Sequence, residues 1–538
     1  MYYNIAQALS EVAQEVPDQI ALIHGQRRYT FKEFDRNSQR YAHVLTDLGV
    51  RKGDRVMLMV KPSMEFICLT FALFRLGAPV ILIDPGMGYK NLLRCIGSVH
   101  PKAFIGIPAA HCFRKFFPQP FLSVEIEICV GSSLGFFGPS LSSLIDDSKG
   151  PFSVCETASN DLAAIIFTTG STGPPKGVRY EHGVFQAQLG LIREYYGISP
   201  QDVDQPAFPL FALFSAALGA CSVLPDMNPA RPAQVNPKKF IATILKHGVT
   251  YSFGSPAIWN VVSRYCLQEK IILPSLKKVL MAGAPVSGEL IDRVKKIMAP
   301  EGEVHIPYGA TESLPIVSMR GSEVLESTWK KTQAGSGACV GRPLPGIEVR
   351  IIPVSDEPID QWNGLMALPP EQVGEIVVRG GVVTRAYDNN EQENALAKIS
   401  DSDSFWHRMG DLGYQDNAGR LWFCGRKAHR LETVQGRMYT ICCEAIFNEH
   451  PRVRRSALVG IGQSGAQLPV LIVEPDGPVG NKADLLLELR EMAKKNELTG
   501  SILHFLIHRS FPVDIRHNAK IFREKLAVWA QQQIDSQH

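Results

Sequence analysis

A stretch of glycine, hydroxyl and proline residues that ends near a lysine is the most chemically suggestive part of the sequence. Residues 167–177 have the sequence FTTGSTGPPKG and follow the apolar run 162–166. We predict a strand that ends in a loop of small residues. Glycines let backbone N–H groups approach an anion closely, hydroxyl groups add donors, and the lysine adds a positive charge, so the loop suits a polyphosphate. The candidate ligands are Thr168, Thr169, Gly170, Ser171, Thr172, Gly173 and Lys176.

Two common nucleotide-binding motifs do not fit. In a Walker P-loop the lysine precedes Ser or Thr, but Gly177 follows Lys176. A dinucleotide-binding fingerprint needs a third glycine, but Val340 stands at that place after Gly335 and Gly337. A solvated Gly/Ser/Thr turn is the alternative for the loop. Its density of donors, with a lysine and no acid, favours anion binding.

The loop resembles the phosphate loop of the AMP-forming adenylate enzymes, a superfamily of acyl-CoA synthetases, peptide-synthetase adenylation domains and luciferases. Further segments match that superfamily in the same order. Residues 308–312 (YGATE) resemble its YGxTE element, and Gly410-Asp411 resembles its GD element. Gly425-Arg426 resembles its inter-domain hinge, and Lys520 its C-terminal lysine. The resemblance therefore spans nearly the whole chain.

The resemblance implies roles around a bound nucleotide. Glu312 would hold Mg²⁺, an ion that prefers oxygen ligands. Thr311 would donate to the α-phosphate, and Tyr308 would pack on the adenine. The same resemblance places further residues at the nucleotide, namely Gly283, Ala284, Pro285, Gly309 and Ala310.

Three matched residues would act on the ribose and the reacting groups. Asp411 would accept hydrogen bonds from the ribose hydroxyls, and Arg426 would reach the ribose as well. Lys520 would bridge the substrate carboxylate and the α-phosphate in the transition state, as a compact movable charge. Taken alone, Asp411 suits a turn and Lys520 an exposed basic position, so these roles depend on the order of the motifs.

The implied chemistry is the activation of a carboxylate. A carboxylate is a poor acylating agent, and its attack on the α-phosphate of ATP gives an acyl-AMP and pyrophosphate. The site must hold the triphosphate and stabilise the charge that develops at phosphorus. The cofactors implied are ATP and Mg²⁺.

Departures from the superfamily pattern narrow the expected second step. Ala428 stands where the hinge usually carries Asp or Lys, which argues against the domain rotation that precedes transfer to CoA. Ala212 stands where many relatives carry His or an aromatic residue, in a region that lines the acyl pocket. This favours a long alkyl substrate, with core packing as the alternative. Ala519 replaces the glycine that usually precedes the C-terminal lysine.

Within the superfamily, several phrases most resemble the β-lactone synthetases of bacterial long-chain olefin synthesis. They are residues 84–88, 209–214, 425–430 and 443–447. Those enzymes activate a 2-alkyl-3-hydroxy fatty acid and close it to a β-lactone. The resemblance therefore implies adenylation and cyclisation of a long-chain acid. The alternatives are a long-chain fatty acyl-CoA ligase, which would use CoA, and a nucleotide-binding module without chemistry.

Composition sets wider limits. The chain has 538 residues, 45% of them hydrophobic and 20% charged, which suits a globular protein with large cores. Its net charge of +3 gives no argument for nucleic acid or an anionic membrane as a partner. The 11 cysteines lack metal-ligand spacing, which indicates reduced thiols. We expect a cytoplasmic protein whose partners are a long-chain acyl substrate and other enzymes of a lipid pathway.

Two stretches bear on targeting. The N-terminus lacks the basic head and apolar run of a signal peptide. Residues 206–225 carry no charge and have the length to cross a bilayer, but prolines bound and interrupt them, so a buried strand and helix are expected.

Alternation of strands and helices predicts an α/β fold with parallel sheets covered by helices. The resemblance implies that residues 1–425 form an AMP-binding adenylation domain of two mixed αβ sheets. Short strands between Gly/Pro turns in 330–424 predict a small barrel-like subdomain within it. The resemblance also implies that residues 426–538 form a small mobile α+β lid domain, which carries Lys520.

Overall fold

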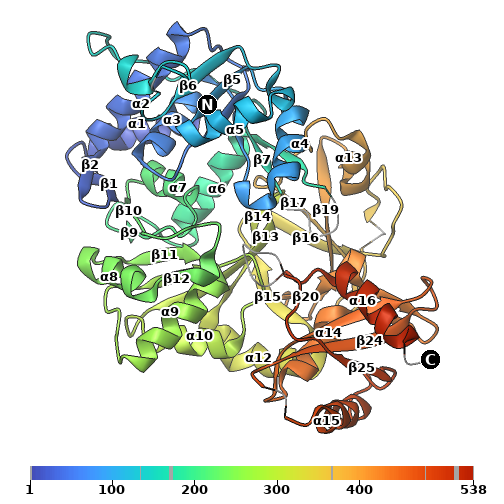
Figure 1. Cartoon of the computed structure of the whole chain (residues 1–538). Coiled ribbons are helices and arrows are strands. Elements are labelled where there is room, and N and C mark those ends of the chain that lie inside the picture. The colour runs from blue at the N-terminus through green and yellow to red at the C-terminus, as the bar shows by residue number, and fades with distance from the viewer. Residues whose placement is uncertain are drawn as a thin grey trace.

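The computed structural model describes residues 3–133, 135–168, 174–364, 367–478, 480–513 and 520–536 (Figure 1). The fold is α/β, as predicted, with mixed sheets covered by helices and a small C-terminal part that has its own sheet. The phosphate-loop residues Thr169, Gly170, Ser171, Thr172 and Gly173 lie outside the described residues, as does Ala519.

The first sheet has six strands in the order β6-β5-β3-β4-β7-β8. All neighbours are parallel except β8, which runs antiparallel to β7. The predicted phosphate loop therefore connects two adjacent strands at the carboxyl end of β7. The strands are β3 (Val56–Met59), β4 (Val80–Leu82), β5 (Ala103–Gly106), β6 (Ile126–Cys129), β7 (Leu162–Phe167) and β8 (Gly177–Glu181).

Helices from the first part of the chain cover this sheet. A capping box begins α2: the Thr30 hydroxyl accepts from the Glu33 N–H, and the Glu33 carboxylate accepts from the Thr30 N–H. The helices α4 and α5 share one apolar cluster with the sheet residues Phe104 and Ile165. The helices are α1 (Ile5–Glu15), α2 (Phe31–Asp47), α3 (Met64–Leu76), α4 (Tyr89–Val99) and α5 (Pro108–Phe116).

The second sheet has the strand order β16-β17-β19-β20-β15-β14-β13-β12-β11-β9-β10-β1-β2, and β18 pairs with β19. The predicted barrel-like part is its antiparallel end, which is hydrogen-bonded to the rest through β14 and β15 rather than separate. The strands are β1 (Ile20–His24), β2 (Arg27–Thr30), β9 (Val203–Asp204), β10 (Cys221–Leu224), β11 (Tyr251–Gly254), β12 (Lys278–Met281), β13 (Glu303–Ala310), β14 (Ser313–Arg320), β15 (Ala338–Pro343), β16 (Ile347–Ile352), β17 (Gly374–Gly380), β18 (Lys398–Asp401), β19 (Ser404–Gln415) and β20 (Leu421–Arg426).

The stretch 206–225 forms a short helix and a strand, as predicted, and most of that helix is buried. Among the described residues, we find no helix with both the length and the apolar character needed to span a membrane. The helices that accompany the second sheet are α6 (His182–Glu194), α7 (Phe211–Ala217), α8 (Pro237–His247), α9 (Pro256–Gln268), α10 (Gly288–Lys295), α11 (Gly321–Glu323), α12 (Trp329–Lys331) and α13 (Glu391–Ala397).

The C-terminal part has a three-stranded sheet in the order β23-β24-β25. Alternate residues of β23 face two separate apolar clusters: Leu458 packs with α14 and α15, and Val459 packs with α16. This part therefore has its own core, although the boundary at Gly425 stays a prediction. Its elements are β21 (Leu431–Thr433), β22 (Gly436–Met438), β23 (Val453–Ile461), β24 (Leu468–Pro475), β25 (His504–Ile507), α14 (Thr440–Asn448), α15 (Lys482–Lys494) and α16 (Arg523–Asp535).

Candidate active site

A cavity of about 2760 Å³ brings the predicted site residues together. It is lined from both sheets and from the C-terminal part, so residues far apart in sequence share one space. A volume this far above the roughly 300–1,000 Å³ of a pocket for one small ligand leaves room for a nucleotide and a second substrate. The predicted residues that line it are Thr168, Lys176, Gly283, Ala284, Pro285, Tyr308, Gly309, Ala310, Thr311, Glu312, Asp411, Arg426 and Lys520.

The described ends of the phosphate loop are held close together. The Thr168 N–H donates to the Lys176 carbonyl at 3.0 Å, which continues the pairing of β7 with β8. The Lys176 ammonium lies 2.5 Å from a carboxylate oxygen of Glu393 and 5.2 Å from the centre of the Tyr387 ring. Lys176 is thus positioned at the cavity wall by two residues that the sequence did not suggest.

The turn between β13 and β14 carries Thr311 and Glu312. The Tyr180 hydroxyl donates to the Thr311 carbonyl at 2.5 Å, and the Thr384 N–H donates to the Glu312 carbonyl at 2.9 Å. The Tyr387 hydroxyl donates to the Glu312 carboxylate at 2.7 Å. Burial raises the pKa of Tyr387, so this phenol stays protonated and remains a donor. The carboxylate of Glu312 is therefore oriented with one oxygen bound.

Position 309 requires a glycine because the backbone at Ser313 lies very close to it in the same hairpin. A Cβ atom on Gly309 would lie 2.3 Å from the Ser313 carbonyl oxygen. No other residue fits there without moving the backbone, which accounts for the glycine in the YGATE segment. The tight hairpin in turn fixes Tyr308 beside the cavity.

Asp411 and Arg426 meet because their strands pair. They are opposite each other in the antiparallel ladder of β19 and β20, and the Arg426 guanidinium lies 2.9 Å from an Asp411 carboxylate oxygen. The Tyr308 hydroxyl donates to the other oxygen at 2.6 Å. Burial raises the pKa of Asp411, while Arg426 and Tyr308 oppose this shift by stabilising the carboxylate. The result is a buried, hydrogen-bonded acceptor at the cavity wall.

Lys520 lies at the start of the last described segment and lines the cavity from the C-terminal part. Arg523, three residues on, forms a buried ion pair with Glu444 of α14 at 2.6 Å. Glu444 also accepts from the Leu458 N–H at 2.8 Å. This pair holds the first turn of α16 against α14 and β23, and so positions the segment that carries Lys520.

Comparisons with known proteins agree with this geometry. The family model described as AMP-binding enzyme matches residues 9–388. The chain is 43% identical to the olefin β-lactone synthetase of Xanthomonas campestris over 98% of both chains, and 42% identical to that of Stenotrophomonas maltophilia over 99% of both. The chain belongs to the AMP-binding enzyme family.

A solved structure supports the fold of this AMP-binding enzyme. The O-succinylbenzoate coenzyme A synthetase of Bacillus subtilis, in complex with ATP and a magnesium ion, superposes with a TM-score of 0.74. It is 23% identical and the match covers 96% of this chain and 98% of that one. By its family and its relatives this chain is an adenylate-forming enzyme, and its fold matches that of this solved structure.

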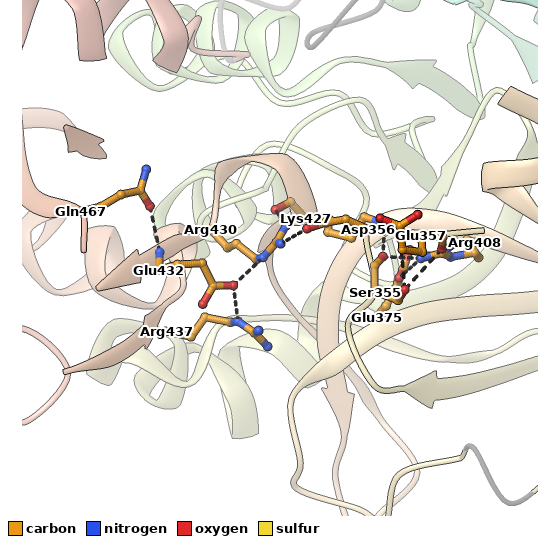
Figure 2. A network of polar contacts seen from close by, with 10 residues as sticks. All are labelled: Ser355, Asp356, Glu357, Glu375, Arg408, Lys427, Arg430, Glu432, Arg437 and Gln467. Atoms are coloured by element: carbon orange, nitrogen blue, oxygen red, sulfur yellow. Dashed lines mark hydrogen bonds and ion pairs between the residues drawn. The ribbon is translucent and has the colours of Figure 1, made fainter. Parts of the chain in front are cut away.

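Charged residues of this AMP-binding enzyme surround the predicted hinge (Figure 2). Glu375 of β17 is fully buried, and its carboxylate lies 2.7 Å from the Arg408 guanidinium and 3.2 Å from the Lys427 ammonium. Lys427 also donates to the Ser355 carbonyl at 2.8 Å. The residue that follows Arg426 is therefore tied to the antiparallel end of the second sheet.

Arg430, at the far end of the predicted hinge, forms ion pairs with residues on both sides of the hinge. The Arg430 guanidinium lies 2.5 Å from Asp356 and 2.8 Å from Glu432, and Glu432 also pairs with Arg437 at 2.9 Å. Figure 2 shows these groups running from the sheet to the C-terminal part in one line. Ala428 contributes no polar side chain between them. The residues on both sides of Ala428 therefore tie the predicted hinge to the second sheet and to the C-terminal part.

Proposed function

We propose that this enzyme activates a long-chain 2-alkyl-3-hydroxy carboxylic acid with ATP and closes the acyl-AMP to a β-lactone. The observation that carries the proposal is the similarity, over almost the entire length, to two proteins named olefin β-lactone synthetase. Enzymes of this family differ in what they do with the acyl-AMP once it has formed. The similarity to these two proteins favours cyclisation of the acyl-AMP over transfer of its acyl group to CoA.

The wall of the cavity supports an alkyl substrate. Residues Phe208, Leu210, Phe211 and Phe214 line it, and the Phe211 ring stacks on Phe253 at 3.6 Å between ring centres. Ala212 is fully buried in the core beside them, so the packing alternative holds for that residue. Aromatic and aliphatic walls of this kind suit an acyl chain.

Adenylation assigns tasks to the residues around the cavity. The carboxylate oxygen of the substrate attacks the α-phosphorus, and pyrophosphate leaves with the electrons of the broken P–O bond. Lys176 and the phosphate loop bind the β- and γ-phosphates, and Thr311 and Lys520 stabilise charge at the reacting centre. Tyr308, Gly283, Ala284 and Pro285 surround the adenine in this proposal. Asp411 and Arg426 hold the ribose.

The residues present fit a magnesium ion. No group of three or more His, Cys, Asp or Glu side chains that could hold a metal occurs among the described residues, so a closed protein-only site is not built there. Mg²⁺ needs little more than one carboxylate together with phosphates and water. Glu312, whose other oxygen is bound by Tyr387, supplies that carboxylate. When bound, the ion neutralises phosphate charge.

Cyclisation needs no outside nucleophile. The 3-hydroxyl oxygen attacks the acyl carbonyl carbon, and its proton passes to water. The bond between the acyl carbon and the phosphate oxygen breaks, and AMP leaves with its electrons. Because the hydroxyl is tethered near the carbonyl, positioning replaces a bimolecular encounter, an effect of up to about 7–11 kcal/mol in favourable cases. The side-chain contacts around Ala428 support this reading, since a CoA ligase must turn its lid about the hinge.

The decisive experiment is product analysis with ATP, Mg²⁺ and a 2-alkyl-3-hydroxy acid. We expect AMP and β-lactone to form at full rate without CoA. The matched acid that lacks the hydroxyl should be adenylated and then stall as bound acyl-AMP. Rapid turnover of that plain acid only when CoA is added, with a thioester product, would instead identify a long-chain acyl-CoA ligase.

Glu312→Gln should lower the rate of adenylation and raise the Mg²⁺ concentration needed for half-maximal activity. The amide keeps the size of the side chain but removes the charge that attracts the ion. Pyrophosphate release measured across a magnesium titration tests this, and excess Mg²⁺ should recover part of the rate. An unchanged magnesium dependence would make Glu312 a structural residue only.

Glu393→Gln should lower the KM for ATP by about threefold, the scale of one partly exposed ion pair. The Glu393 carboxylate competes with phosphates for Lys176, and the amide removes that competition and a nearby negative charge. Glu391→Gln is the matched control, because Glu391 is exposed on the same helix. Weaker ATP binding in the Glu393 variant would show that this carboxylate orients Lys176 for the nucleotide.

A further inference from the structure

Several large apolar side chains protrude from one region of the surface, which we call the aromatic face. Phe116 is 81% exposed, Leu122 75% and Phe136 71%, while Tyr89 and Phe117 are exposed to a lesser degree. They lie on α4, on α5, next to the short helix η2 (Gln119–Phe121) and in the loop that follows β6. Large apolar groups exposed together mark an interaction surface rather than ordinary surface scatter.

Contacts join several of the elements that carry the aromatic face. The Tyr89 ring stacks on Phe117 with ring centres 6.2 Å apart, and Phe117 also meets Phe113 at 5.0 Å. The Lys115 ammonium donates to the Phe136 carbonyl at 2.5 Å. In Figure 1 the helices α4 and α5 lie next to each other beside the six-stranded sheet. These contacts connect α4, α5 and the loop that follows β6.

The charge of this region differs from that of the whole chain. Five Lys or Arg residues and no Asp or Glu stand between Asp84 and Glu125, in a chain whose overall net charge is only +3. Arg114 and Lys102 are paired with acids from outside the stretch, namely Glu127 and Asp54. The remaining three, which are exposed, are Lys90, Arg94 and Lys115. The aromatic face is thus flanked by positive charge.

The aromatic face also adjoins the cavity. Leu92 of α4 and Ala110 and Phe113 of α5 line the cavity, and Phe113 is the residue whose ring meets Phe117. The aromatic face therefore adjoins an apolar part of the cavity wall. A long-chain acid is poorly soluble in water and partitions into lipid, so a cavity that begins beside a lipid-binding surface would receive it directly.

We propose that the aromatic face binds the surface of an anionic lipid bilayer. Aromatic and aliphatic side chains insert at the headgroup boundary, and lysines and arginines beside them attract anionic headgroups. The positive charge attracts anionic headgroups but would not strengthen contact with an apolar protein surface. It therefore favours an anionic bilayer as the partner. That the surface delivers substrate rests on the function proposed above, whereas the binding to lipid does not.

Co-sedimentation of the full-length protein with vesicles tests the proposal. We expect binding to vesicles that contain phosphatidylglycerol, weak binding to pure phosphatidylcholine vesicles, and loss of binding at high salt. The double variant Phe116→Ser with Leu122→Ser should reduce the bound fraction at least tenfold. Its control is Val434→Ser with Val528→Ser, which removes two exposed apolar side chains from the C-terminal part.

A second pair of variants tests the charge. Lys90→Glu with Arg94→Glu should abolish the preference for phosphatidylglycerol, and Lys482→Glu with Arg490→Glu should leave it unchanged. Wild-type protein that stays in the supernatant at low salt, or binding that all variants retain, overturns the proposal. Variants that alter self-association in analytical ultracentrifugation, but not vesicle binding, would assign the face to contact between copies of this chain and also overturn it.

The failure of this proposal and that of the proposed function can be told apart. Carboxylate-dependent pyrophosphate release with a detergent-dispersed acid should be the same in the wild type, in the Phe116→Ser/Leu122→Ser variant and in the Lys90→Glu/Arg94→Glu variant. An unchanged rate also shows that both variants are folded. Vesicle binding without any β-lactone product would leave the lipid surface standing and remove only the proposed reaction.

Discussion

Lys520→Ala is expected to slow carboxylate-dependent pyrophosphate release by about a hundredfold or more, the scale of losing one group that stabilises charge in a transition state. ATP binding should change little, because Lys176, Tyr308 and Asp411 remain in the cavity wall. Isothermal titration with ATP and a pyrophosphate-release assay on the same preparation separate the two effects.

Lys525→Ala is the matched control for this experiment. Lys525 is exposed in the first turns of α16, and its ammonium lies 4.8 Å from the centre of the Phe522 ring. Its loss removes a positive charge from the same helix without removing a group from the cavity wall. A Lys520 variant that keeps the wild-type rate would exclude the assigned role, whereas a loss of ATP binding would mean that Lys520 holds the nucleotide in the ground state.

Arg408→Met is expected to lower the free energy of unfolding by about 3–5 kcal/mol, as when one partner of a buried ion pair is removed. Arg408 and Glu375 are 2% and 0% exposed, and Arg408 also donates to the carbonyls of Glu357 and Leu396 at 2.8 and 3.0 Å. Methionine leaves the Glu375 carboxylate with Lys427 alone and leaves those carbonyls without this donor. Urea denaturation of variant and wild type side by side measures the loss.

Arg379→Met provides the comparison for the same substitution on the surface. Arg379 also lies on β17 and pairs with Glu348 at 2.7 Å, but these side chains are 30% and 45% exposed. Water screens this pair, so we expect a loss of no more than about 1 kcal/mol. Equal losses in the two variants would contradict the idea that the hinge network is stabilised by burial.

Local structure could be predicted from the sequence where neighbouring residues alone determine it. The Thr30–Glu33 cap depends on residues three apart, and the prolines around 206–225 gave grounds to expect a helix and strand in place of a membrane span. The positions of the nucleotide motifs followed from their order along the chain. The cavity brings all of their described residues together.

Other parts of the candidate site depend on register and packing. The pairing of Asp411 with Arg426 follows from the alignment of β19 with β20, which no single residue specifies. Tyr387 binds Glu312, and Glu393 pairs with Lys176. Both contacts come from a segment whose sequence has no phosphate-binding pattern. The last helix begins at Arg523, and the ion pair of Arg523 with Glu444 holds its first turn. Tertiary contacts of this kind leave little trace in local sequence.

The second sheet has a consequence for how the chain folds during synthesis. β1 pairs with β10 in parallel, with Leu22 opposite Ser222. At about 5–20 residues per second, a ribosome needs roughly 10–40 s to supply that partner. Until then the β1–β2 hairpin has an open edge, while α1 and α2 from the same stretch already cover the other sheet. Nascent chains shorter than about 225 residues should therefore expose an unpaired strand, and chaperones that bind extended apolar segments would be needed most during that interval.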